Sequence, residues 1–138
     1  MSDFYKYFKE NMNGLNLAAP EALFGTLQMA LGTTASVLGL VEKLGTRVTV
    51  LDVIGAGTRM EALAVVGACS ATYYVGAVIG SLAVATARSL AGGTSLADVM
   101  FVARLHKFNP PWLLGQLQRD PRLYKGSAAK TVALPVAR

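Results

Sequence analysis

Two long runs without a charged residue dominate the pattern of apolar and polar positions in this chain. The first covers residues 22–41 and the second covers residues 62–87. A helix that crosses a bilayer needs about 20 consecutive apolar residues. The second run is long enough to cross with tilt, whereas the first is weakened by Gln28 and by four Ser and Thr residues. The pattern predicts an all-α chain whose core, residues 15–93, is a two-helix hairpin of transmembrane type.

Residues typical of helix ends flank both runs. Pro20 suits the first turn of a helix, and Gly45 suits its end. Thr58 with Glu61 forms a capping box that would open the second helix, and Gly92–Gly93 would close it. We therefore expect each run to be one continuous helix.

The connector between the runs, residues 42–61, alternates like a strand and then reaches the sequence GAG at residues 55–57. The third glycine of a dinucleotide-binding fingerprint would fall on Met60, and no βαβ pattern surrounds it. A tight hairpin connection explains these glycines better.

Shorter elements are expected on both sides of the hairpin. Residues 1–14 predict an amphipathic helix that ends at Asn13–Gly14. Ser95 with Asp98 predicts the start of a third helix, which the prolines after Asn109 must stop. Beyond Trp112 the chain is expected to be irregular. The chain thus divides into an N-terminal amphipathic segment, 1–14, the hairpin, 15–93, and a basic C-terminal segment, 94–138.

Small residues recur on one face of each predicted helix. At 100° per residue, positions four apart form a continuous ridge in the second run. The ridge consists of Ala64, Ala68, Thr72, Gly76 and Gly80. In the first run, glycines recur every seven residues, at Gly25, Gly32 and Gly39. Helices in lipid associate through close contact across small residues, so we expect these positions to be helix-packing faces.

A mildly polar face is predicted roughly opposite the ridge. Ser70, Tyr74 and Ser81 lie on it, and the first run contributes Gln28. Polar groups at bilayer depth are unfavourable unless they meet one another or water. These four residues are therefore candidates for lining a water path between several copies of the chain. Plain packing within a hairpin or a dimer is the alternative explanation of both faces.

The positive charge of the chain is concentrated at its C-terminal end. Residues 88–138 hold eight Lys and Arg against two Asp, a net +6, whereas the whole chain carries +5. Aromatic residues accompany these cations, which is typical of a membrane surface. The candidate membrane-surface residues are Arg104, Lys107, Trp112, Arg119, Arg122, Tyr124 and Lys125. An ordinary solvated basic tail is equally compatible, and no recognised motif favours binding to nucleic acid.

The sequence contains no motif of an enzyme. Cys69 and His106 are the single cysteine and the single histidine, and no GxSxG, HExxH or Walker sequence occurs. A buried small residue is the better interpretation of Cys69, and a helix C-terminus that of His106. We expect no catalysis, no metal and no cofactor. The N-terminus does not have the pattern of a secretory signal peptide, so export would use another route.

The ridge sequence AVVGACSATYYVGAVIG, with SLAVATAR after it, resembles those of glycine-zipper membrane toxins. More closely, residues 15–93 resemble small pore-forming antibacterial effectors of the bacterial type VI secretion system. This resemblance implies a self-associating toxin that is carried by the secreted tube protein and inserts into the inner membrane of the target cell. There it would let ions cross and dissipate the membrane potential, and a membrane immunity protein would protect the producer.

Two other functions fit the same residues. The chain could be a resident two-pass inner membrane subunit or a holin-like protein, for which helix packing is the whole purpose. It could also be a soluble helical interaction module that buries both runs against a partner.

Overall fold

The computed structural model describes residues 3–56, 69–86 and 95–125. Within these ranges the ordered elements are helices, and the predicted all-α class is confirmed. The helices are α1 (Asp3–Gly14), α2 (Glu21–Phe24), α3 (Leu27–Leu44), α4 (Val50–Ala56), α5 (Ala71–Thr86), α6 (Leu96–Leu105), α7 (Leu113–Arg119) and α8 (Arg122–Lys125).

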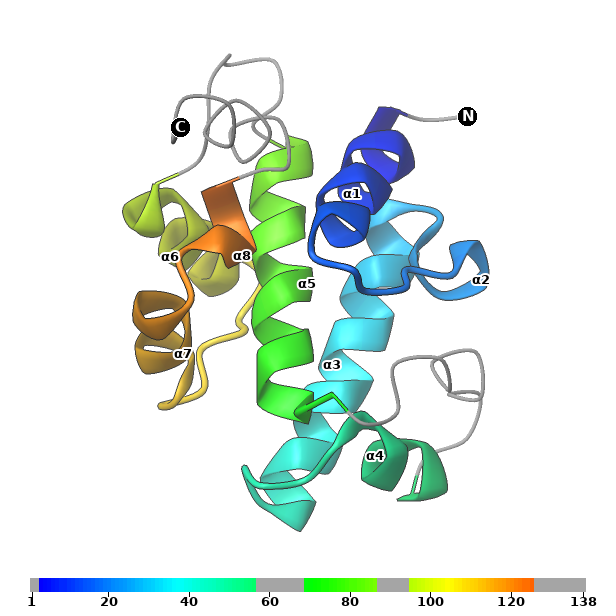
Figure 1. The fold of residues 1–138 in the computed structure, drawn as a ribbon, viewed down its shortest axis with the longest axis vertical. Helices are drawn as coiled ribbons and strands as arrows, with labels where there is room; N and C mark the ends of the chain where they lie inside the picture. The colour runs from blue at the N-terminus through cyan, green and yellow to red at the C-terminus, as the bar shows by residue number, and fades with distance from the viewer. Residues whose placement is uncertain (1–2, 57–68, 87–94, 126–138) are drawn as a thin grey trace, which may run out of the picture.

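Helix α5 stands at the centre of the bundle (Figure 1). It contacts α1, α3 and α4 on one side and α6, α7 and α8 on the other. A helix that is apolar on every face has to be covered on every face, and α5 is such a helix. The hydrophobic core therefore lies around α5 rather than between two equal arms of a hairpin.

Helix α1 confirms the amphipathic segment that the sequence predicts, and it ends at Gly14 as expected. Phe8 and Met12, one turn apart, are fully buried against the core, whereas Lys6 and Lys9 are exposed. The ring of Phe8 stacks on that of Phe24 with centroids 5.1 Å apart. Aromatic burial of this kind fixes α1 to the rest of the bundle.

The first uncharged run is not one helix, which corrects the prediction. It is divided between α2 and α3, because Thr26 adopts an extended backbone and its hydroxyl accepts a hydrogen bond from the amide of Met29 at 3.1 Å. A hydroxyl at this position satisfies a free amide at the helix start. The predicted end is confirmed, since α3 stops before Gly45, whose φ is 107°.

Among the residues that the structure describes, no helix combines the length and the apolar character needed to cross a bilayer. The described part of the second run forms α5, whose 16 residues extend about 24 Å, less than the roughly 30 Å of a hydrocarbon core. Helix α3 is longer, but Glu42 and Lys43 lie in its last turns. The described helices form a bundle around the enclosed helix α5.

The connector after α3 contains the short helix α4 and an isolated antiparallel bridge between Thr49 and Ser70. The amide of Val50 donates to the carbonyl of Cys69 at 2.8 Å, and the amide of Ala71 donates to that of Val48 at 3.0 Å. These bonds join residues 48–50, just before and at the start of α4, to residues 69–71 at the start of α5. The capping box at Thr58 and the glycines at 92–93 lie outside the described residues.

The capping box that opens the third predicted helix is confirmed. The hydroxyl of Ser95 accepts from the amide of Asp98 at 3.1 Å, and the Asp98 carboxylate accepts from the amide of Ser95 at 3.3 Å. The prediction of an irregular chain beyond Trp112 is wrong up to residue 125, because α7 and α8 form there. Both helices bury leucines completely. These leucines are Leu113, Leu117 and Leu123.

Candidate functional site

The candidate functional site is the enclosed helix α5 with the contacts that cover it. From Ala71 to Ala85 every residue is buried except Tyr73, which is half-buried, and none is charged. Two glycines and several β-branched residues make this sequence a poor helix former in water. Its helical structure therefore depends on the surrounding helices.

One face of α5 lies directly against α7 and α8. A Cβ atom added to Gly80 would overlap the carbonyl oxygen of Leu123 and lie 3.3 Å from the Cα of Tyr124. A Cβ added to Gly76 would lie 3.1 Å from a Leu123 methyl group and 3.3 Å from the Cγ of Gln116. The two glycines thus let α8 approach the backbone of α5, a role that a larger residue at position 80 cannot fill.

Buried hydrogen bonds join α5 to helices on both of its sides. The Asn11 amide group donates to the hydroxyl of Ser81 at 2.7 Å and to the Leu123 carbonyl at 3.2 Å. The hydroxyl of Thr72 donates to the Gln116 side chain at 3.1 Å. Within the described residues, every buried side-chain nitrogen and oxygen has a hydrogen-bond partner. Asn11 therefore connects α1, α5 and α8 at one point.

The other side of α5 is aromatic. The ring of Tyr74 lies 6.4 Å from that of Phe24, and its hydroxyl donates to the Ala18 carbonyl at 2.7 Å. Tyr5 makes the corresponding bond to the carbonyl of Ala19 at 2.8 Å. Burial, followed by the nearby carboxylate of Glu21, raises the pKa of Tyr5. Both tyrosines thus form hydrogen bonds with the backbone of the segment between α1 and α2 and hold it against the core.

The predicted packing residues do not form one continuous interface. Thr72, Gly76 and Gly80 share the face that α7 and α8 cover. Gly32 and Gly39 are exposed on α3, with open space where a Cβ would lie. Gly25 is buried at the break between α2 and α3, and Ala64 and Ala68 lie outside the described residues.

Of the predicted pore-lining residues, Ser70, Tyr74 and Ser81 belong to the α5 segment, whereas Gln28 lies on α3. Ser81 bonds to Asn11, whereas Tyr74 bonds to the backbone of Ala18. Ser70 is exposed at the start of α5, with its hydroxyl 3.0 Å from that of Thr72. Gln28 is exposed on α3. Any water path they line would require a different arrangement of the helices.

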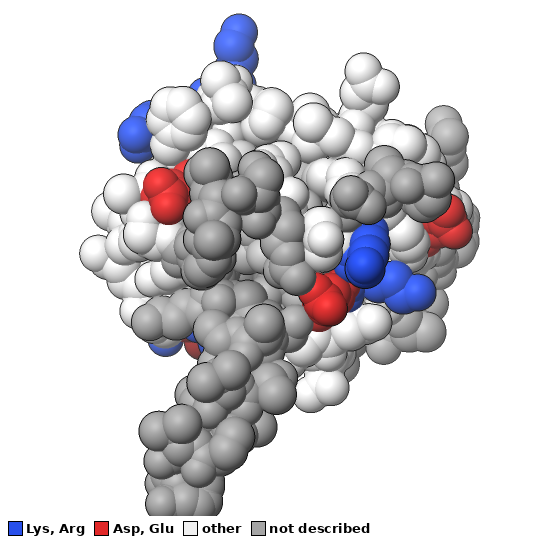
Figure 2. All heavy atoms as spheres, turned by 90° about the horizontal axis from the view of Figure 1, so that it is seen from above, with Lys and Arg blue, Asp and Glu red and all other residues white. Residues whose placement is uncertain are grey.

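The predicted membrane-surface residues are mostly accessible. The exposed ones are Arg104, Lys107, Arg119 and Arg122. Trp112 is half-buried, and the prediction is wrong for Tyr124, which is buried next to Gly80. The side chain of Lys125 lies outside the description. Figure 2 shows Lys and Arg interspersed with Asp and Glu on the face it presents, without a basic patch.

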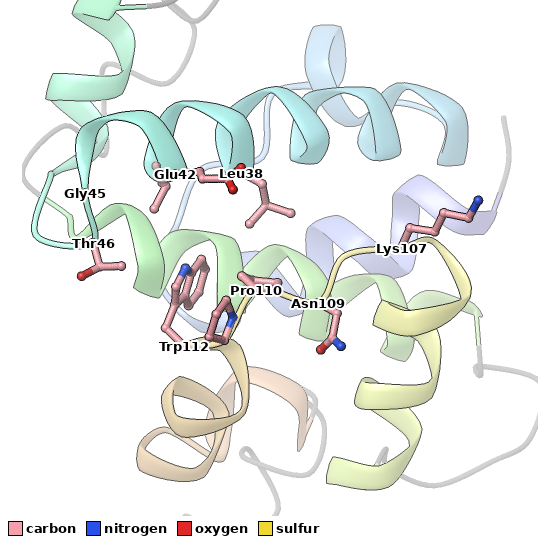
Figure 3. A pocket seen from close by; sticks show the side chains of 10 residues that line it. Leu38, Glu42, Gly45, Thr46, Lys107, Asn109, Pro110 and Trp112 are labelled. Atoms are coloured by element: carbon pink, nitrogen blue, oxygen red, sulfur yellow. The ribbon is translucent and has the colours of Figure 1, made fainter.

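An open groove of about 570 Å³ lies between the C-terminal half of α3 and the segment that leads into α7 (Figure 3). Leu38 and Glu42 of α3 form one wall, and Pro110 and Trp112 form the other. The amino end of Lys107 points away from the groove (Figure 3). The lining is mainly apolar and holds no convergent set of polar groups.

Residues 3–56, 69–86 and 95–125 bring together no three His, Cys, Asp or Glu side chains that could hold a metal ion. No protein-family model matches the chain, and no curated protein or solved structure is similar to it. The resemblance to type VI secretion effectors consequently stays a prediction.

Sequence reasoning missed three residues that hold α5 in place: Asn11, Gln116 and Leu123. A signal for Gln116 was present, because Leu113, Gln116 and Leu117 recur at the 3.6-residue period of a buried helical face, whereas Leu123 lies outside this pattern. Asn11 gave no such signal, since a polar residue in a polar segment is normally solvated.

Proposed function

We propose that this chain is a pore-forming toxin that carries its membrane-inserting segment enclosed in a helical bundle. The observation that supports this most is the uncharged helix α5, covered on both sides by the other helices of a chain of only 138 residues. In sequence the uncharged run extends to residues 62–87, which is long enough to cross a bilayer. Lipid forces a backbone to be helical, so an environment of lipid suits a sequence that is a poor helix former in water.

At the target membrane α5 leaves the bundle and the 62–87 segment inserts. Copies then associate across Thr72, Gly76 and Gly80, because small residues let helices approach closely in lipid. Ions cross between the copies and the membrane potential falls. Delivery by the tube protein of a type VI secretion system, and protection by a membrane immunity protein, belong to the same proposal.

The test is ion release from vesicles of anionic lipid, together with a dye attached to Cys69. Cys69 is the only cysteine and is half-buried just before α5, so the dye reports on that end of the segment. We expect release of the vesicle contents, and quenching of the dye by quenchers fixed in the lipid. The matched control carries the dye at Ser36, exposed on α3, in the Cys69→Ser, Ser36→Cys variant, and its quenching should be weaker.

Vesicles that keep their contents at every ratio of protein to lipid would contradict the proposal. If the Cys69 dye is quenched without release, the chain is a membrane subunit rather than a pore.

A second candidate function is supported by exposed apolar residues on α6. Phe101 and Leu105, one turn apart, are 60% and 61% exposed. Such a pair can contact a partner helix, as an interaction module would require. In that case the vesicles stay intact, and Phe101→Ser together with Leu105→Ser abolishes binding to the partner.

A further inference from the structure

We propose that α7 and α8, residues 113–125, form a strap that keeps α5 in the bundle and opens when an anionic membrane surface binds its arginines. This inference rests on the proposed pore function and adds the step that controls it. The strap lies on the side of α5 opposite to α1 and α3 (Figure 1).

The strap occupies the face through which copies of α5 would associate. The Leu123 carbonyl lies where a side chain on Gly80 would be, and the Gln116 side chain accepts the hydrogen bond of Thr72. A second α5 cannot reach Thr72, Gly76 or Gly80 while these contacts exist. Opening of the strap must therefore precede association.

The strap has little stability of its own. Helices α7 and α8 have 7 and 4 residues, and isolated helices of this length do not persist in water. Their structure depends on three fully buried leucines and on the hydrogen bonds to Asn11 and Thr72. Water replaces such hydrogen bonds at little net free energy, so exposure of the three leucines is the main cost when the strap opens as a local unit.

Two exposed arginines of the strap can bind an anionic membrane surface, and their present hydrogen bonds are the ones that such binding would replace. Arg122 donates to the hydroxyl of Tyr73 at 3.1 Å, which links the strap to α5 at the edge of the bundle. Arg119 donates to Gln116 at 3.3 Å. Asp120, between them, accepts from the Gln116 amide group at 2.8 Å. Lipid phosphates are stronger acceptors for arginine than a phenol or an amide is, so an anionic surface competes for both arginines.

The test locks the strap by a crosslink between positions 73 and 122. In the Cys69→Ser background, Tyr73→Cys and Arg122→Cys are joined by a bismaleimide whose spacer contains a reducible disulfide. We expect release from anionic vesicles to be at least about tenfold slower in the locked protein. Reduction of the spacer should restore the rate of the same variant before crosslinking, which is the matched control.

A second variant tests opening without a crosslink. Leu123→Ala removes the leucine that contacts Gly76, and Leu17→Ala makes the same truncation at a buried leucine between α1 and α2. Truncating a buried leucine shifts an opening equilibrium by about 30-fold or more, so Leu123→Ala should accelerate release by that factor. Leu17→Ala should accelerate it much less.

A third variant tests the arginines. Arg119→Gln should slow release from anionic vesicles by about fivefold, because it removes one cation and leaves the Arg122–Tyr73 bond in place. Locked and reduced proteins that release ions at one rate, or equal acceleration by the two leucine variants, would overturn the strap. An absence of release from the reduced and the parent proteins would instead contradict the proposed pore function.

Discussion

Helices α3 and α5 are similar in length and each contains two glycines, yet the glycines have opposite surroundings. Gly32 and Gly39 of α3 are exposed with open space beside them, whereas Gly76 and Gly80 of α5 lie against α7 and α8. The recurrence of glycine in an uncharged run therefore does not identify a packing face by itself. The segment that covers the glycines identifies it, and for α5 this segment contains Leu123, which lies 43 residues after Gly80.

Alanine in place of a covered glycine of α5 should change the free energy of unfolding more than any other substitution in this comparison. Gly80→Ala places a Cβ against the Leu123 backbone, and we expect the free energy of unfolding to fall by about 3 kcal/mol, the upper end for overpacking. Urea denaturation measures it. Gly76→Ala contacts only side-chain atoms and should lower it by about 1 kcal/mol. Equal losses would mean that α8 is not seated on Gly80.

The next largest effect is expected from a buried hydrogen bond that joins α5 to other helices, compared with one made within α3. Asn11→Leu leaves the Ser81 hydroxyl and the Leu123 carbonyl without their donor, so we expect about 2 kcal/mol less stability. Adding Ser81→Ala should recover part of this loss. The control on α3 is Thr34→Val, because Thr34 donates only to Ala30 in its own helix, at 2.6 Å, and it should change stability by less than about 1 kcal/mol. Denaturation curves of all four proteins make the comparison.

Alanine in place of the exposed glycines of α3 should stabilise the protein, which is the opposite effect. Gly32→Ala and Gly39→Ala each improve helix propensity and meet no neighbouring atom. We expect each to raise the free energy of unfolding by about 0.5–1 kcal/mol, seen as a higher urea midpoint. A loss of stability would show that another surface covers α3.

The smallest effect is expected at Gln28, a predicted pore-lining residue that is exposed on α3. Gln28→Ala should change stability by no more than about 0.5 kcal/mol. If only the 62–87 segment forms the path, release of ions from vesicles should also be unchanged. A clear change in ion selectivity would instead place α3 in the membrane with α5.

The sequence was sufficient where local chemistry decides the structure. The capping box of Ser95 and Asp98, the stop before Gly45 and the amphipathic helix α1 were all predictable, because each depends on residues within a few positions. The break at Thr26 could not be predicted, because a threonine can lie within a helix or cap the start of one.

The enclosure of α5 was not predictable from the same pattern. An apolar helix needs cover from lipid or from protein, and composition does not distinguish the two. The decisive contacts of the candidate site, from Asn11 to Ser81 and from Gly80 to Leu123, join residues far apart in the chain. The 26-residue uncharged run suggested a membrane, whereas the leucines of α7 and α8 supplied the cover.

The contact between Gly80 and Leu123 can form only after α8 has been synthesised, well after α5. Helix α8 is synthesised after α5 and adds to its cover, and 38 residues separate Ala85 from Leu123. At translation rates of about 5–20 residues per second, the face of α5 that α7 and α8 cover stays open in the nascent chain for roughly 2–8 s. Chaperones or a nearby bilayer can capture the chain in that interval, so the timing of translation helps decide which of them does.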